Sequence, residues 1–168
     1  MIVGVHHLAI STPDLDALAG FYCDELGFER IFDAAWEPGN AAADAVTGLE
    51  GSAARTAMLR GGNLYLELFE FRAPSPQAAP ERRPVCDHGI THLCLLVDDV
   101  DAATERIGLD FQSAPQDLGG GVRTVYGRDP DGNVVELKEL AGGDDHPVSL
   151  RRLELQRTGV DRADQLDA

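Results

Sequence analysis

The sequence predicts an α+β fold made of two βαβββ modules, because one pattern occurs twice along the chain. Residues 7–10 (HLAI) match residues 92–95 (HLCL), and an Asp-x-Asp-Ala segment begins seven residues after each histidine. Each copy then ends with a Gly-Asn turn and a strand that contains a glutamate. A duplicated unit of this kind predicts equivalent strands in the two halves, related by an approximate two-fold axis.

The first module is expected to span residues 1–72. After an opening strand, Thr12 and Pro13 are suited to be the N-cap and the first residue of a helix. Apolar residues at helical spacing then continue to Gly27, which ends the helix. The strands expected in this module are residues 2–11, 28–32, 55–60 and 64–71.

Residues 33–54 interrupt this module without a clear hydrophobic period. Connections of this length inside a compact domain are typically lids or binding loops, so we expect a loop insert with one helical turn. Trp36, the only tryptophan, lies in it. This residue has two interpretations, an aromatic that faces a substrate or an anchor that holds the loop on the core.

Residues 73–89 contain four prolines and predict a linker. The second module follows in residues 90–140, with a short helix capped by Asp98-Asp99 and a final hairpin. The remaining residues, 141–168, are mostly polar. They are expected to form an extension that packs outside the modules or at a subunit contact, with a disordered end.

Glu67 and Glu136 each lie inside an otherwise apolar strand. Burying a carboxylate alone is costly, so each acid needs a partner or faces water. The repeat also places His7 and His92 at equivalent positions, whereas strand alternation directs the neighbouring His6 away from His7. Singly, each histidine also suits a hydrogen-bonded core role and each glutamate an exposed one.

The joint occurrence of the four residues at repeat-equivalent positions favours a metal site. Two imidazoles and two carboxylates suit a divalent metal and leave coordination positions open for substrate oxygens. His6 and His88 are expected at the surface or in contact with the ligands rather than among them.

Composition excludes several classes of partner. A formal net charge of −15 argues against nucleic acid and anionic membranes, which are bound through clustered Lys and Arg. No apolar run reaches the length of a membrane span and no signal-peptide pattern is visible, so a cytoplasmic protein is expected. Three cysteines without a CxxC spacing predict reduced thiols.

Five motifs give the chain a family resemblance: VHHLAISTPDLD, FYCDELGF, LYLELFEF, GITHLCLLVDDVD and YGRDPDGNVVELKE. Over nearly all of residues 2–140 the chain resembles the vicinal oxygen chelate superfamily of glyoxalases, bleomycin-resistance proteins and extradiol dioxygenases. The resemblance implies two modules that form an incomplete barrel around a metal cleft. The implied metal is Zn, Ni, Co, Mn or Fe. Matched by motif, the implied ligands are His7, Glu67, His92 and Glu136.

A His-Glu-His-Glu set is similar to that of bacterial glyoxalase I and favours an enzyme. The expected activity is a metal-dependent glyoxalase-like lyase or isomerase, including an epimerase. Glu136 or Glu67 would remove a proton α to a metal-chelated carbonyl of a small-molecule substrate. The segment that follows Glu67 lacks the Asn-Trp-Gly pattern that meets glutathione in glyoxalase I, which counts against a glutathione substrate.

Two alternative functions stay open. Tyr126, ten residues before Glu136, is a feature that ring-cleaving dioxygenases dependent on Fe(II) or Mn(II) often share. A non-catalytic protein that binds an antibiotic or another small molecule is the second alternative. The resemblance also implies a homodimer.

Overall fold

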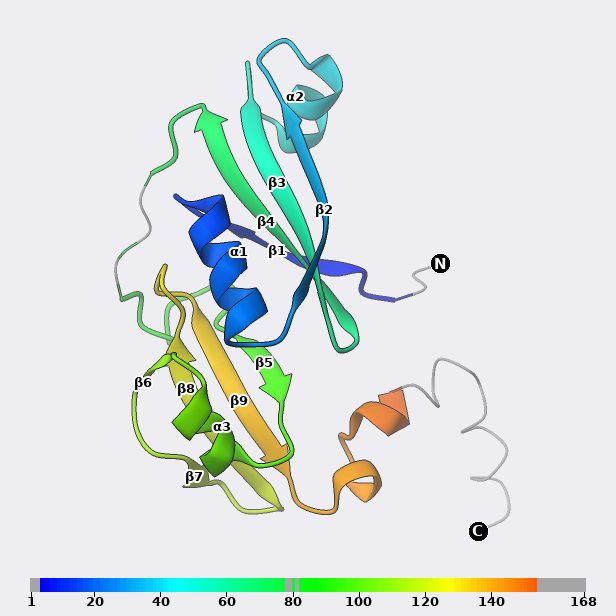
Figure 1. Ribbon diagram of the computed structural model, residues 1–168, viewed down its shortest axis with the longest axis vertical. Helices are drawn as coiled ribbons and strands as arrows, with labels where there is room; N and C mark the ends of the chain where they lie inside the picture. Colours follow the sequence, from blue (N-terminus) through cyan, green and yellow to red (C-terminus); the bar gives the residue numbers. More distant parts are fainter. Residues whose placement is uncertain (1–3, 78–79, 81, 154–168) are drawn as a thin grey trace, which may run out of the picture. The chain divides into compact units, whose positions relative to one another are not determined.

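The computed structural model describes residues 4–77, 80 and 82–153 and confirms an α+β fold with two sheets (Figure 1). One compact unit comprises Met1–Asp87 with the turn Asp129–Asn133, and the other comprises the rest of the chain. Parts of the predicted first strand and of the C-terminal extension lie outside the described residues. Within those residues, no helix is long and apolar enough to cross a membrane.

The first unit is a sheet with one helix packed against it. In chain order its elements are β1 (His7–Ser11), α1 (Leu15–Asp24), β2 (Glu29–Trp36), α2 (Ala41–Thr47), β3 (Ala53–Gly61) and β4 (Leu64–Ala73). The sheet order is β1-β4-β3-β2, with β1 parallel to β4 and the other neighbours antiparallel. α1 covers one face (Figure 1), where Leu15, Leu18 and Tyr22 are buried with Leu66 and Leu68 of β4.

The second unit repeats this arrangement. Its elements are β5 (Leu93–Leu96), α3 (Val100–Arg106), β6 (Asp110–Phe111), β7 (Gln116–Asp117), β8 (Val122–Arg128), β9 (Val134–Leu140) and the 3₁₀ helix η1 (Gly143–Asp145). The sheet order is β5-β9-β8-β6, and β7 also pairs with β8. Val100 and Ala103 of α3 are buried together with Val135 and Leu137 of β9. The short strand β7 was not expected from the sequence.

The two hairpins that end the modules differ in their turns. Gly61 pairs with Leu64 at the end of the first hairpin and Arg128 with Val134 at the end of the second, so two residues form the first turn and five form the second. The Asn-to-Glu spacing differs because each asparagine directly precedes its strand, and Glu67 is the fourth residue of β4 whereas Glu136 is the third residue of β9. Asp129 organises the longer turn, because its carboxylate accepts a hydrogen bond from the Asn133 backbone N–H at 2.8 Å.

The N-cap of the first helix lies two residues later than predicted. Asp14 is the N-cap of α1, and its carboxylate accepts a hydrogen bond from the Ala17 N–H at 3.0 Å. The predicted role of Thr12 was therefore wrong, and its hydroxyl instead bonds to the backbone of Asp14. Asp99 caps α3 in the equivalent way, by accepting from the Ala102 N–H at 2.9 Å.

The expected loop insert at residues 33–54 is instead largely ordered secondary structure. β2 continues to Trp36, α2 spans Ala41–Thr47, and β3 begins at Ala53. The apolar period was hidden because β2 is exposed along most of its length. The segment between α2 and β3 is held by Asp44, whose carboxylate accepts hydrogen bonds from Gly51 and Ser52.

Trp36 has the contacts of an anchor. Its indole N–H donates to the Ser52 hydroxyl at 3.0 Å. Its ring meets Phe69 and Phe71 edge-on, at centroid distances of 6.2 and 6.1 Å. These contacts support the anchoring interpretation, since the indole uses both its polar and its apolar parts within its own unit.

Each unit ties the start of its helix to its sheet through three charged residues. In the first unit, Glu70 accepts a hydrogen bond from the Leu15 N–H at 3.1 Å and another from Arg55 at 3.0 Å. Arg55 also pairs with Asp16 in the first turn of α1, at 2.8 Å. Hydrogen bonds from Arg55 and Arg30 hold the pKa of Asp16 below its ordinary value.

The second unit contains the same charged set. Glu139 accepts from the Val100 N–H at 3.0 Å, and Arg123 bridges from Glu139 at 3.7 Å to Asp101 at 2.7 Å. The hydrogen bonds from Arg123 lower the pKa of Asp101 in the same way. Because an unpaired N–H at a buried helix start is costly, these residues fix the angle at which each helix leaves its sheet.

Replacing Glu70 with alanine is expected to lower the free energy of unfolding by about 1–3 kcal/mol, because the Leu15 N–H and Arg55 both lose an acceptor. Urea unfolding followed by circular dichroism measures the change. The control is Glu50→Ala at an exposed position, which is expected to change stability by less than about 0.5 kcal/mol. Equal effects of the two substitutions would show that Glu70 does not anchor the helix.

Candidate functional site

In the first unit, His7 and Glu67 form a pair on the sheet face that α1 does not cover. The His7 Nε2 and Glu67 Oε2 atoms are 3.3 Å apart. Glu67 alternates along β4 with the buried Leu66 and Leu68, so its side chain points to the other face. The side chains remain accessible, with 38% of His7 and 21% of Glu67 exposed.

In the second unit, His92 and Glu136 form the corresponding pair. The His92 Nε2 and Glu136 Oε2 atoms are 3.0 Å apart. Here the carboxylate is far more enclosed, with only 5% of the Glu136 side chain exposed. Glu136 alternates along β9 with the buried Val135 and Leu137, as the sequence pattern predicted.

Strand register makes the two pairs equivalent. Glu67 lies opposite Ala9 across the parallel β1–β4 pair, and Glu136 lies opposite Cys94 across the parallel β5–β9 pair. In both cases the histidine is two residues before the residue opposite the glutamate. His7 is the first residue of β1, whereas His92 directly precedes β5, and its 3.0 Å contact shows that it lies beside Glu136. The duplicated sequence thus produces a duplicated diagonal His–Glu contact.

The second nitrogen of each imidazole is held by the preceding residue. His7 Nδ1 is 2.8 Å from His6 Nδ1, and His92 Nδ1 is 2.9 Å from the Thr91 hydroxyl. With the proton on Nδ1, each ring keeps Nε2 available as a ligand, and an outer partner that orients the ring is typical of metal-binding histidines. The two pairs have the donor chemistry of a divalent-metal site.

The structure corrects the expected direction of His6. Strand alternation was predicted to direct His6 and His7 to opposite sides, but β1 starts only at His7. His6 therefore lies outside the alternation, and its ring also stacks on Tyr65 at a centroid distance of 5.2 Å. His6 was predicted to lie at the surface or in contact with a ligand, and it is exposed and in contact with His7.

Several polar groups hold the Glu136 carboxylate. Its Oε1 atom is 2.7 Å from the Thr124 hydroxyl and 3.2 Å from Lys138 Nζ, and the Cys94 thiol also donates to the carboxylate. Burial alone would raise the pKa of Glu136, but hydrogen bonds from Thr124, Cys94 and Lys138 outweigh it and lower that pKa. Glu136 is consequently a fixed anion.

Two further side chains adjoin this carboxylate. Burial and the neighbouring carboxylate raise the pKa of the Cys94 thiol to about 12, so it stays protonated at neutral pH. Tyr126 lies opposite Glu136 in the β8–β9 pair, and its ring centroid is 5.0 Å from that of His92. Burial and the charge of Glu136 raise the Tyr126 pKa, so the phenol is also neutral.

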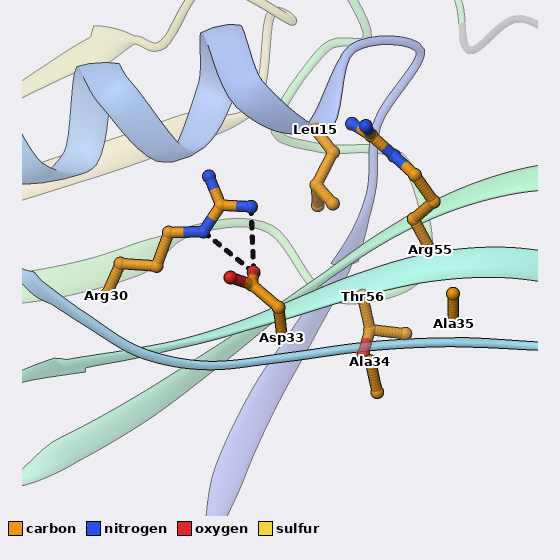
Figure 2. Close-up of a pocket in the computed structure, with 7 residues that line it drawn as sticks. All are labelled: Leu15, Arg30, Asp33, Ala34, Ala35, Arg55 and Thr56. Carbon is orange, nitrogen blue, oxygen red and sulfur yellow. Dashed lines mark hydrogen bonds and ion pairs between the residues drawn. The ribbon is translucent and has the colours of Figure 1, made fainter.

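The four predicted ligands are thus found as two pairs, one in each unit. In the part of the chain that the structure describes, no group of three or more His, Cys, Asp or Glu side chains is placed to hold a metal ion. A cavity of about 370 Å³ in the first unit lies elsewhere, beside the start of α1 (Figure 2). Its charged lining residues are Arg30, Asp33 and Arg55, and it contains none of the four ligands.

Comparison with known proteins identifies the family. Residues 4–137 match the family model of the Glyoxalase/Bleomycin resistance protein/Dioxygenase superfamily. The chain belongs to this superfamily. Its members are usually enzymes and commonly bind divalent metals. A relative from an Actinomyces species, named 2-epi-5-epi-valiolone epimerase, is 36% identical over 156 residues, which cover 84% of this chain and 81% of the relative.

Solved structures show the same fold. A glyoxalase family protein from Bacillus cereus has a TM-score of 0.75 at 24% identity, covering 83% of this chain and 95% of that one. The fosfomycin resistance protein FosX from Listeria monocytogenes, solved with Mn(II) and sulfate, has a TM-score of 0.56 at 19% identity, covering 83% and 93%. At these identities the likeness concerns the superfamily fold.

Sequence reasoning missed the residues that surround the ligands. Thr91 and Thr124 were not singled out, and no contact of Cys94 or Lys138 with Glu136 was predicted. Thr91 occupies the repeat position of His6, directly before the ligand histidine, which is a signal that the repeat alignment contains. The contacts of Thr124 and Lys138 depend on side-chain conformations and left no comparable signal.

Replacing Thr124 with valine is expected to lower the free energy of unfolding by about 1–3 kcal/mol, because the buried Glu136 carboxylate loses a hydrogen bond. Chemical denaturation of metal-free protein measures this change. Thr104→Val is the matched control, since Thr104 is only half-buried on α3 and its hydroxyl donates to the Asp101 carbonyl within its own helix. A loss no larger than that of the control would contradict the fixed position of Glu136.

Proposed function

We propose that this protein is a divalent-metal-dependent epimerase that removes and returns a proton at a carbon next to a carbonyl group. The observation that supports the proposal most strongly is the duplicated His–Glu pair, in which a histidine Nε2 atom lies 3.3 or 3.0 Å from a carboxylate oxygen at repeat-equivalent positions. A duplicated pair of this kind supplies four ligands when the two halves act on one ion.

The donor set fits such an ion. Two imidazoles and two carboxylates suit Zn, Ni, Co, Mn or Fe, and six-coordinate ions keep positions free for two substrate oxygens. The proposed ligands are therefore His7, Glu67, His92 and Glu136. When bound, the ion supplies a Lewis acid that favours negative charge on the substrate oxygens.

The two glutamates are the proposed acid–base groups. Epimerisation requires that a proton leave one face of the carbon and that a proton return to the opposite face, with no net change in composition. Glu67 and Glu136 offer two separate proton carriers for these steps. Glu67 is the more accessible of the two, because more of its side chain is exposed and it is not held by the Thr124, Cys94 and Lys138 contacts that fix Glu136.

The epimerase-named relative supports this reaction over the others of the superfamily. Its substrate, 2-epi-5-epi-valiolone, is accordingly the first compound to test. The dioxygenase and antibiotic-binding alternatives would predict no such turnover.

Epimerisation in D₂O tests the proposal. With Mn(II) or Ni(II) added, NMR is expected to show deuterium entering the substrate at the inverted carbon. Glu67→Gln and Glu136→Gln are each expected to slow inversion by about 10²-fold or more, because each removes a proton carrier. If one glutamate variant still exchanges the hydrogen at the inverted carbon of only one epimer, the remaining glutamate is the proton carrier for that face of the carbon.

The control is Glu50→Gln, which changes the same functional group at an exposed site outside both pairs. Metal content is measured for every variant, so that loss of a ligand is separated from loss of a proton carrier. Unchanged inversion in both glutamate variants, or inversion without deuterium incorporation, would contradict proton transfer by these residues.

A further inference from the structure

Lys138 is the feature of the site that its metal ligands do not explain. It is the only lysine in the chain, and it follows Glu136 by two residues on β9, so it shares the face of the carboxylate. Its Nζ atom is 3.2 Å from Glu136 Oε1, and only 29% of its side chain is exposed. A half-buried ammonium is costly without a partner, and Glu136 is the partner that Lys138 has.

The two oxygens of Glu136 are divided between different partners. Oε2 faces His92 Nε2 at 3.0 Å, whereas Oε1 faces Lys138 and the Thr124 hydroxyl. Lys138 therefore does not occupy the oxygen that is directed at the histidine. Its positive charge can stay beside Glu136 when Oε2 and His92 act as ligands.

The first unit lacks this charge. Lys138 follows Glu136 by two residues, and the residue that follows Glu67 by two is Phe69. The Phe69 ring stacks on Phe71 at a centroid distance of 5.6 Å. The repeat thus carries an aromatic ring at one position and an ammonium at its equivalent. The cation is consequently not part of the repeated framework of the fold.

Charge counting indicates what the ammonium does. Two carboxylates neutralise one divalent ion, which leaves no net charge to hold a substrate that becomes negative. Lys138 adds one positive charge next to the ligands. A fixed positive charge stabilises an oxyanion and, by repulsion, weakens the binding of a metal cation nearby.

We propose that Lys138 is a positioning and specificity residue. Its positive charge lowers the affinity of the site for the metal ion and raises its affinity for substrates with negatively charged vicinal oxygens. This inference rests on the proposed metal site of the four ligands.

Two binding measurements with opposite expected signs test the inference. Calorimetric titration of metal-free protein with Mn(II) is expected to show roughly 10- to 100-fold tighter binding in Lys138→Met than in the unmodified protein, because a repelling charge is removed. Titration of the metal-loaded proteins with oxalate, a dianion with adjacent oxygens, is expected to show roughly tenfold weaker binding in the same variant.

Lys138→Arg keeps the charge and is expected to resemble the unmodified protein in both titrations. Arg151→Met removes one positive charge at an exposed position and controls for net charge. Should Lys138→Met fail to fold by circular dichroism, Lys138→Gln replaces it in the same titrations.

The outcomes separate this inference from the proposed function. No Mn(II) binding by the unmodified protein would overturn the metal-dependent function and this inference with it. Normal binding by the unmodified protein, with weaker or unchanged Mn(II) affinity in Lys138→Met, would overturn only the role of Lys138. Unchanged oxalate affinity in that variant would do the same.

Discussion

The parallel pairing of β1 with β4, and of β5 with β9, decides where the chemistry of this chain can occur. Parallel neighbours in fixed register bring a residue near one strand start to the same face as a residue further along its partner. His7 and Glu67 meet in this way, and His92 and Glu136 repeat the contact. The helix on the opposite face buries the alternating apolar residues, which prevents a one-residue slip that would turn the glutamates inward.

The repeat is faithful in framework and divergent in surroundings. Both units share the helix caps and the charged residues that bind the helix start to the sheet. Beside the ligands they differ, since Glu67 has the aromatic Phe69 as a neighbour on its strand while Glu136 has Lys138. This divergence gives one carboxylate access to solvent and the other a fixed set of hydrogen bonds. Two chemically distinct acids thus arise from one structural motif.

Much of the fold and the equivalent positions of the two His–Glu pairs could be predicted because repetition and strand alternation are visible in the sequence. The faces of Glu67 and Glu136 follow from a period of two residues, and each glutamate is flanked along its strand by two buried apolar residues. Alternation failed at His6 because the strand starts one residue later. The exposed β2 gave no apolar period, so an ordered segment resembled a loop.

The surroundings of Glu136 could not be predicted for a different reason. Whether Lys138 reaches the carboxylate, and which oxygen it approaches, depends on side-chain conformations that no local pattern encodes. The sequence alone could not decide whether Asp14 or Thr12 caps the first helix, because both residue types are good N-caps. Contacts between long flexible side chains are where sequence reasoning loses its accuracy.

The central claim is that the two His–Glu pairs are halves of one metal site, and metal stoichiometry tests it most directly. Elemental analysis of the purified protein after loading with Mn(II) or Zn(II) would be compared with His7→Ala, His92→Ala and the double variant. The account predicts about one ion per chain, lost in either single variant. Two ions per chain, with one retained in each single variant, would show that the pairs are independent sites and contradict the account.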